Sequence, residues 1–427
     1  MKLIHNVTEY GALPNSPTLQ TDKLQAAIDA CFLGGGGEVV VPAGTFRTAT
    51  LRLRSNVTLR LLSGAILEGS TDPEDYTHFC EDTVEPFVPF EDENIKAMTW
   101  PFSRWANAII KCYDAENVRI IGEEGSFIDG KNCYDAIGEE KFRGPHAIHA
   151  YKCRNMEFGG YTIRDSANWA HCIVDSQNIF AHDLTVLGGH DGFHCRICTN
   201  ILIENCEFYT GDDCIAGFDD QKMVVRNCLL DCACSAMRLG GTDILIDNCR
   251  THAPSRYGFR GWMTPEEKAA SAPTNETHRH TMHTPFLYFC DFPTRIRKTP
   301  GNIVVQNCTF ENPNSFFRLW FEGKHQWCAN RCLNDITFRN CVATGVSTTL
   351  DLLSDATERV TFRLENVEIS AREGCEDELF MQAENFKEIN FRNVKLHGFR
   401  NPTIRTKGDG KIVMVETEGI TVLPAEE

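Results

Sequence analysis

The sequence of 427 residues predicts an all-β protein, a single-stranded right-handed parallel β-helix with an N-terminal capping helix. Two observations predict this fold. Short apolar segments recur about every 22 residues, and an Asn-Cys pair recurs at the same place within five of them. Each segment alternates apolar and polar residues over four or five positions, which is typical of a half-buried strand.

The recurring segments define the repeat. They begin at residues 155, 178, 200, 222 and 243, and further copies begin at 302, 335, 359 and 388. One such strand cannot bury its apolar face alone, so neighbouring strands must stack. The leucine-rich consensus L-x-x-L-x-L is absent and no helical segment follows each strand, which favours a β-helix over a leucine-rich horseshoe. Successive coils then rise by about 4.8 Å, and residues one repeat apart lie almost above one another.

The Asn-Cys pairs are interpreted as structural. Asparagine side chains at equivalent turns can form a ladder of amide hydrogen bonds, and cysteines can stack inside the coil as small apolar groups. The pairs occupy residues 205–206, 227–228, 248–249, 307–308 and 340–341.

Residues 1–427 are predicted to form a single domain, with 1–76 as the N-terminal cap and first coils. Residues 21–33 (TDKLQAAIDACFL) predict an amphipathic helix that covers the open N-terminal end, with Asp22 as its N-cap. Its apolar face comprises Leu24, Ala27, Ile28, Cys31 and Phe32. Residues 262–300 are polar, contain several prolines and interrupt the repeat, so they are predicted to be a long loop inserted near the cleft.

Composition and charge exclude several classes of partner. A formal net charge of −17 disfavours nucleic acid and anionic membrane surfaces. No apolar run is long enough to span a membrane, and the start MKLIHNVTEYGAL lacks the apolar core of a signal peptide. The 20 cysteines of so large a chain are expected to be reduced thiols, so the cytoplasm is the predicted location. The oligomeric state is left open.

Three carboxylates are the candidate catalytic groups. Asp191 lies in GGHDGFHC and the pair Asp212 and Asp213 in YTGDDCIAG, each just past a short apolar strand and one repeat apart. Stacking of coils is expected to bring them together, and crowding raises the pKa of at least one carboxyl group. Cleavage of a glycosidic bond needs such an acid and a carboxylate, about 6.5–9.5 Å apart for inversion or about 5–5.5 Å for retention. Spacing alone does not choose between these outcomes, and Asp and Gly also favour ordinary turns.

Cationic residues are expected to surround the carboxylates. His190 and His194 flank Asp191, and the following coils carry Arg238, Arg256 and Arg260. These residues predict a patch of acid, imidazole and guanidinium groups that binds substrate. A second histidine group, His278, His280 and His283, matches no zinc motif and is interpreted as loop histidines, so no metal and no cofactor are expected.

The chain resembles glycoside hydrolase family 28, the polygalacturonase family of pectin-cleaving β-helices. Residues 9–76 are similar to the family's N-terminal region, and ENVRIIGEEGSFIDGKN is similar to its following coil. GGHDGFHC and TGDDCIAG are similar to the family's Asn-Thr-Asp-Gly and Gly-Asp-Asp-Cys-Ile-Ala motifs. The resemblance implies inversion, with Asp212 as general acid and with Asp191 and Asp213 activating the attacking water.

The chain also departs from the family pattern. Gly189-His190 replaces Asn-Thr, and Ser235 stands where the family has the histidine of Gly-His-Gly. In the stretch similar to Arg-Ile-Lys, Arg260 is kept and Trp262 replaces the lysine, while Phe218 replaces another common lysine. The resemblance implies that these cations bind galacturonate, so their loss argues against ordinary polygalacturonate as substrate. Phe218 and Trp262 are predicted to stack on a sugar face, or else to serve in packing.

The sequence therefore predicts an inverting glycoside hydrolase that cleaves pectin-derived or related plant-glycan oligosaccharides, with exo action favoured over endo. Two alternatives stay open. A polysaccharide lyase on the same fold would bind Ca²⁺ at the Asp cluster and use Arg238 or Arg260 as base. A carbohydrate-binding β-helix without activity would explain the missing histidine and lysine. The sugar and the linkage are not indicated.

Overall fold

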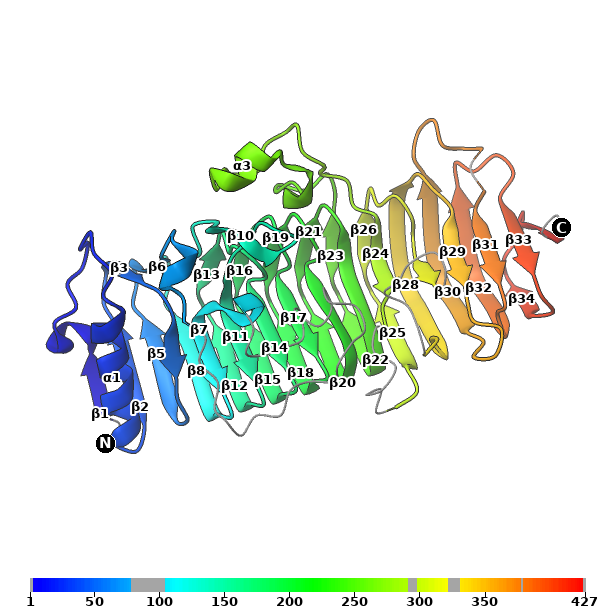
Figure 1. Ribbon diagram of the computed structural model, residues 1–427. Coiled ribbons are helices and arrows are strands. Elements are labelled where there is room, and N and C mark those ends of the chain that lie inside the picture. The colour runs from blue at the N-terminus through cyan, green and yellow to red at the C-terminus, as the bar shows by residue number, and fades with distance from the viewer. Residues whose placement is uncertain (1–2, 78–103, 291–297, 322–330, 378, 425–427) are drawn as a thin grey trace. The chain divides into compact units, whose positions relative to one another are not determined.

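The computed structural model describes residues 3–77, 104–290, 298–321, 331–377 and 379–424. They belong to two compact units: unit 1 comprises residues 1–211 with 257–278, and unit 2 comprises residues 212–256 with 279–427. Within each unit, parallel strands stack coil upon coil (Figure 1). The predicted all-β parallel β-helix is confirmed, whereas the single domain over 1–427 stays a prediction.

Unit 1 has three stacks of parallel strands. One stack contains β4 (Leu51–Leu53), β7 (Ala108–Tyr113), β11 (His146–Tyr151), β14 (His171–Val174) and β17 (Phe193–Arg196). The second contains β1 (Leu3–Asn6), β2 (Gly37–Val41), β5 (Val57–Leu61), β8 (Glu116–Gly122), β12 (Arg154–Gly159), β15 (Gln177–His182) and β18 (Thr199–Glu204). The third contains β3 (Gly44–Thr48), β6 (Ala65–Gly69), β9 (Phe127–Asp129), β13 (Thr162–Arg164), β16 (Thr185–Gly188) and β19 (Glu207–Thr210). Outside the stacks lie β10 (Tyr134–Glu139) and the short helices η1 (Val7–Tyr10), η2 (Pro73–Asp75) and η3 (Arg104–Ala106).

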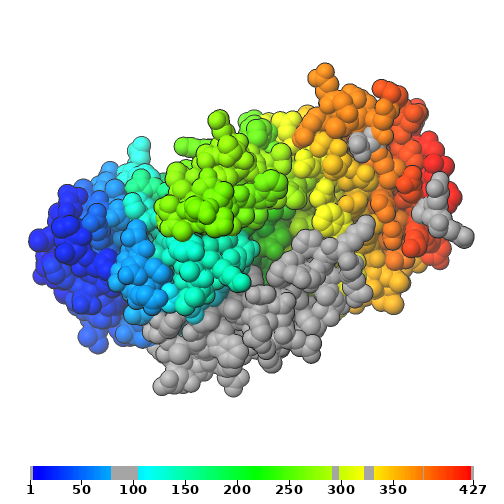
Figure 2. Space-filling view, turned by 45° about the horizontal axis from the view of Figure 1, so that its top comes forward, coloured from blue at the N-terminus to red at the C-terminus, as the bar shows by residue number. Residues whose placement is uncertain are grey.

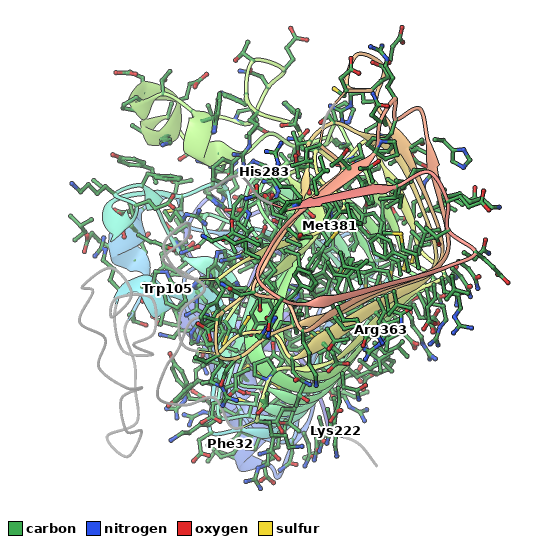
Figure 3. All side chains as sticks on the ribbon, turned by 90° about the vertical axis from the view of Figure 1, so that its right-hand side faces the viewer. Phe32, Trp105, Lys222, His283, Arg363 and Met381 are labelled. Carbon is green, nitrogen blue, oxygen red and sulfur yellow. The ribbon has the colours of Figure 1, made fainter. Side chains whose placement is uncertain are left out.

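Unit 2 repeats this arrangement with longer strands, several of which pass from one stack into the next. They are β20 (Ile215–Arg226), β21 (Leu229–Cys232), β22 (Ser235–Asp247), β23 (Arg250–His252), β24 (Thr284–Tyr288), β25 (Gly301–Gln306), β26 (Thr309–Glu311), β27 (Arg318–Trp320) and β28 (Asp335–Val346). The series continues with β29 (Leu350–Leu353), β30 (Thr361–Ala371), β31 (Met381–Glu384), β32 (Glu388–His397), β33 (Thr403–Lys407), β34 (Lys411–Val415) and β35 (Thr421–Pro424). Met381 lies inside the coil, and Arg363 lies on its outer side (Figure 3).

Strand register decides which side chains face the core. In the stack that contains β7, β11, β14 and β17, the rows alternate between core and outer face. Ile110, Ile148, His171 and Phe193 share one row, and Lys111, His149, Cys172 and His194 share the next. Phe193 packs against the core residue Phe158, so the row of Lys111 and His194 points away from the core.

Asparagine ladders and buried cysteines hold the coils in register, as predicted. In unit 2, Asn248 donates to Asn227 at 2.9 Å and Asn340 donates to Asn307 at 3.1 Å. Unit 1 has its own ladder at another turn, through Asn56, Asn117, Asn155, Asn178 and Asn200. These asparagines adopt a positive φ, which this residue tolerates well. The five cysteines of the Asn-Cys pairs are buried, and the described cysteines are present as thiols rather than disulfides. The cytoplasmic location stays a prediction.

The predicted N-terminal helix is present as α1 (Thr21–Leu33), which packs against β1 and β2 (Figure 1). Leu24, Ala27, Ile28 and Cys31 are buried, but Phe32 is half-exposed. Asp22 is not the N-cap: Gln20 takes that position without a side-chain cap, and Asp22 lies in the first turn. The capping role of α1 stays a prediction.

The predicted loop over 262–300 contains two regular elements. Helix η4 (Arg260–Trp262) leads into α3 (Pro265–Ala269), which begins with a capping box between Thr264 and Glu267. α3 lies against β10 in unit 1 (Figures 1 and 2). Residues 284–288 form strand β24, which pairs with β22 and β27 in unit 2. The alternation of apolar residues in TPFLY was too short to recognise as a strand.

Candidate active site

The loop between β16 and β17 holds Asp191 in a buried position in unit 1. Its side chain is about 1% exposed. The backbone is crowded here: a β-carbon at Gly189 would collide with the side chain of Arg260, and one at Gly211 would collide with the carbonyl oxygen of Gly258. The segment around Gly258 and Arg260 therefore packs closely on this loop and fixes the backbone that carries Asp191.

His194 binds the carboxylate of Asp191. Its Nδ1 lies 2.9 Å from Asp191 Oδ2, and the Nε of Arg196 lies 3.3 Å from His194 Nε2. An arginine Nε–H can only donate, so Nε2 accepts and the proton of the neutral imidazole is on Nδ1. His194 therefore donates to Asp191, and the chain Arg196–His194–Asp191 orients the carboxylate.

Two tryptophans hold this chain in place. The ring of Trp169 stacks on His194 with centroids 3.7 Å apart and planes at 10°. The guanidinium of Arg196 lies 4.7 Å from the centroid of Trp169 and 5.3 Å from that of Trp105. Trp105, labelled in Figure 3, lies on a different side of the coil from Phe32. Such cation–π contacts stabilise a desolvated guanidinium.

His190 and Arg260 belong to a second buried group in unit 1. Both are no more than 3% exposed, and the two ring nitrogens of His190 have no hydrogen-bond partner among the described residues. Burial is the main cause that lowers the pKa of Arg260 to about 10, with Asp165 opposing and Arg143 adding to the shift. The Nζ of Lys268 lies 4.3 Å from the ring centroid of Phe142. These cations gather beside the loop of Asp191, and a substrate-binding role for His190 and Arg260 stays a prediction.

Unit 2 holds the other predicted carboxylates. Asp213 is buried and accepts hydrogen bonds from the backbone N–H of Ser235 at 3.0 Å and from the guanidinium of Arg238. Arg238 also lies 4.4 Å from the ring centroid of Phe289. Asp212 is half-buried. Arg238 therefore orients Asp213, whereas Asp212 presents a more accessible carboxyl group. That Asp191 meets this pair stays a prediction.

The two predicted stacking aromatics have different surroundings. Phe218 is about 1% exposed and packs edge-to-face against Phe289 with centroids 5.8 Å apart. A ring buried in this way offers no face to a sugar, so the stacking prediction for Phe218 is wrong. Trp262 is 63% exposed, and its stacking role stays a prediction.

Histidines 278, 280 and 283 belong to different units. His278 lies in unit 1, where its Nε2 is 3.2 Å from Glu267 Oε2, while His280 and His283 lie in unit 2. His280 Nδ1 donates to the carbonyl oxygen of Ser255. Within the described ranges, the group with metal-binding spacing is instead Asp212, Asp213 and Cys234, whose donor atoms lie within 4.8 Å. Burial, Asp213 and Asp212 raise the pKa of Cys234 well above its ordinary value, so its thiol is protonated.

Sequence reasoning missed several buried polar residues of unit 1. Lys111, His146, His149 and Arg196 come from β7, β11 and β17 of one stack, whereas Trp105 comes from η3 and Trp169 from the loop before β14. The alternation in FHCR places Arg196 on the same face as His194, which was an available signal. No helix in the described part of the chain is long and apolar enough to cross a membrane.

Comparison with known proteins connects these carboxylates to a family. Residues 92–234 match the model of glycosyl hydrolases family 28, and this range contains Asp191, Asp212 and Asp213. Over this range the chain is similar to the polygalacturonases of that family. It is 30% identical to an exo-poly-alpha-D-galacturonosidase of Dickeya chrysanthemi over 273 residues, and the match covers 51% of this chain and 43% of that one. It is 26% identical to a probable polygalacturonase of Vitis vinifera over 230 residues, covering 50% and 45%. It spans less than half the length of both relatives.

Solved structures share the fold of this protein. An exopolygalacturonase from Thermotoga maritima matches with a TM-score of 0.67 and 17% identity, over 93% of this chain and 92% of that one. A family 28 exopolygalacturonase from Yersinia enterocolitica matches with a TM-score of 0.70 and 17% identity, over 98% and 79%. At this level of identity the likeness supports the β-helical fold alone.

Proposed function

We propose that this protein belongs to glycosyl hydrolases family 28 and hydrolyses glycosidic bonds in galacturonate-containing oligosaccharides of the pectin type. One observation supports this above others. The family match spans the loop of Asp191 and the Asp212–Asp213 pair, and Asp191 and Asp213 are each held by specific donors. A carboxylate that is already held in place needs little rearrangement of its surroundings as the reaction proceeds.

The proposed reaction inverts the anomeric centre. Asp212, the more accessible carboxyl group, donates a proton to the oxygen of the leaving sugar. Asp191 and Asp213 activate the attacking water as bases. His194 holds Asp191, and Ser235 and Arg238 hold Asp213. These hydrogen bonds fix the orientation of each of the two carboxylates.

Contacts of the two arginines disfavour the lyase alternative. Arg238 is ion-paired with Asp213, and Arg260 is about 2% exposed. A lyase would also bind Ca²⁺ at the Asp cluster, but Arg238 already supplies a cation to Asp213 there. An unsaturated product that absorbs in the ultraviolet, with loss of activity in chelator, would nevertheless establish the lyase.

The proposal is tested by comparing the hydrolytic activity of the parent protein with that of Asp212→Asn. We expect the parent protein to release sugar from galacturonate oligomers, measured by chromatography, and proton NMR to show that the first anomer released is inverted. Asp212→Asn should lose turnover while its thermal unfolding is unchanged, because Asp212 is half-buried. Hydrolysis at the parent rate would refute the role of Asp212. Sugar binding by the parent without any turnover would support the carbohydrate-binding alternative.

A further inference from the structure

Two polar side chains lie inside the coil of unit 1, next to the loop that carries Asp191. His171 belongs to the inward-facing row of β14, and Tyr161 lies just before β13. Both are no more than 2% exposed. The ring of His171 lies beside the rings of Phe158 and Phe193, with centroids 5.6 Å and 4.7 Å away. Burying an imidazole and a phenol among apolar rings costs free energy unless both are hydrogen-bonded.

The two side chains form one hydrogen-bonded chain with a defined direction. Nδ1 of His171 lies 3.1 Å from the carbonyl oxygen of Gly192, and Nε2 lies 2.9 Å from the hydroxyl oxygen of Tyr161. A carbonyl oxygen can only accept, so Nδ1 carries the proton of the neutral imidazole and Nε2 accepts from Tyr161. Burial lowers the pKa of His171 to about 4, although the bond to Gly192 opposes this shift, so the ring is neutral at neutral pH. Burial also raises the pKa of Tyr161 well above its ordinary value, which keeps the hydroxyl protonated.

Gly192 is the residue that follows Asp191, so this chain acts on the backbone of the Asp191 loop. The main-chain N–H of Ala170 donates to the carbonyl oxygen of Asp191 at 2.9 Å, and that of His171 donates to the carbonyl oxygen of Gly192 at 3.2 Å. The carbonyl oxygen of Gly192 therefore accepts two hydrogen bonds from one residue, through the main chain and through the imidazole. Rotation of this peptide plane would break both bonds. The loop is thus held from inside the coil, while His194 holds the carboxylate of Asp191.

Neighbouring coils fix Tyr161 in turn. A β-carbon at Gly122, on the preceding coil, would lie 2.5 Å from the Cβ of Tyr161, so the two residues are in close contact. The N–H of Thr185, at the start of β16, donates to the carbonyl oxygen of Tyr161 at 3.2 Å. The row itself does not require a polar residue, because Ile148 is the partner of His171 on the preceding strand. A buried polar network whose members are all satisfied makes the groups that it binds rigid.

We propose that Tyr161 and His171 are positioning residues that hold the loop of Asp191 and thereby set the position of its carboxylate. They act through the backbone of Gly192 rather than on the carboxylate itself. Their effect on hydrolysis rests on the proposed function, in which Asp191 activates water. A base that activates water must stay within hydrogen-bond reach of it, so a small displacement of the loop lowers kcat more than it weakens substrate binding.

Steady-state hydrolysis and hydrogen–deuterium exchange of the full-length protein test this proposal. Tyr161→Phe removes one hydroxyl group. Tyr76→Phe is its matched control, because Tyr76 is also buried in unit 1 and donates to the carbonyl oxygen of Ser70 at 2.9 Å. We expect kcat on a galacturonate oligomer to fall about two- to tenfold in Tyr161→Phe, with KM nearly unchanged, and to stay at the parent value in Tyr76→Phe. Amide exchange in residues 188–194 should become faster by a similar factor in Tyr161→Phe alone.

A second pair of variants separates the hydrogen bond of the imidazole from its packing. His171→Leu keeps an apolar side chain in the row but removes the donor to Gly192, so kcat should fall and exchange should rise at least as much as in Tyr161→Phe. His171→Asn should recover part of both changes, because its amide can donate from the position of Nδ1. Equal kcat for His171→Asn and His171→Leu would overturn the role of this hydrogen bond. Tyr161→Phe remains the test should His171→Leu fail to fold.

The outcomes separate this proposal from the proposed function. If the parent hydrolyses galacturonate oligomers and Tyr161→Phe has the kcat of Tyr76→Phe, the proposal is wrong. A lower kcat without faster exchange in residues 188–194 also overturns it, because the effect would not pass through the loop. If the parent hydrolyses nothing, the exchange decides. Faster exchange in Tyr161→Phe than in Tyr76→Phe then shows that the pair holds the loop while the proposed function fails, and equal exchange overturns both.

Discussion

Replacing His194 by phenylalanine removes the donor that holds Asp191 while keeping an aromatic ring on Trp169. The ring stack, with centroids 3.7 Å apart and planes at 10°, can be retained by phenylalanine. The hydrogen bond from Nδ1 to Asp191 Oδ2, 2.9 Å long, cannot. We therefore expect a nearly native fold with a poorly oriented carboxylate.

The size of the effect follows from the burial of both groups. His194 and Asp191 are each about 1% exposed, so water does not replace the lost donor. A hydrogen bond to a charged group contributes about 1.5–3 kcal/mol. Because each 1.36 kcal/mol changes a rate about tenfold, kcat should fall roughly 10- to 150-fold. KM should change little, since the contact of His194 is with the carboxylate.

The assay is steady-state hydrolysis of a galacturonate oligomer, followed by reducing-end release. His194→Asn should recover most of the activity, because its amide can donate from the position of Nδ1. His182→Phe is the matched control: His182 also stacks on a ring, that of Phe180, and lies 2.8 Å from Asp183. Equal kcat for His194→Phe and His182→Phe would refute the role of His194 in positioning Asp191.

Three further predictions concern the fold and the second carboxylate site. Arg238→Met leaves the buried Asp213 without its cation. We therefore expect kcat to fall at least about 100-fold and the free energy of unfolding to fall by about 3 kcal/mol. An unchanged kcat would contradict this prediction. Asn178→Ala removes both its ladder bonds and puts alanine at φ 58°, so urea denaturation should show a loss of about 2–4 kcal/mol. The pKa of His146 is lowered from 6.5 to about 3, so between these pH values the unfolded chain binds a proton that the folded chain does not. Between pH 3 and 6.5 the free energy of unfolding should therefore rise by up to about 1.4 kcal/mol per pH unit. Denaturation measured at several pH values should show a smaller rise for His146→Leu, whereas His397→Gln, at an exposed position, should behave like the parent.

The fold could be predicted because every coil of the repeat requires similar residue types at equivalent positions. A coil of about 22 residues must return each strand to the same place, so alternation, turn asparagines and buried cysteines recur in phase. Asn227, Asn248, Asn307 and Asn340 behave as the pattern requires. The pattern failed where a local signal was short or ambiguous. Asp22 has the residue type of an N-cap, but the N-cap is Gln20, two residues earlier, and strand β24 lies within a polar insertion.

The site was less predictable because side chains on the outer face meet through register rather than through equal spacing. Lys111 and His149 are partners on neighbouring strands yet lie 38 residues apart, because a long connection intervenes, whereas His149, Cys172 and His194 follow one another at 23 and 22 residues. A search for residues that lie one repeat apart in the sequence therefore pairs the wrong residues wherever a coil contains a long connection. Trp105 packs against His146 from the short helix η3, which lies outside the strand repeat and is signalled by no periodicity. In a β-helix a turn can change in length without disturbing the strands. Acidic and basic side chains on the outer face can also be exchanged without changing the apolar pattern of the core. The core pattern therefore predicts the fold, but it does not predict which charged side chains meet on the outer face.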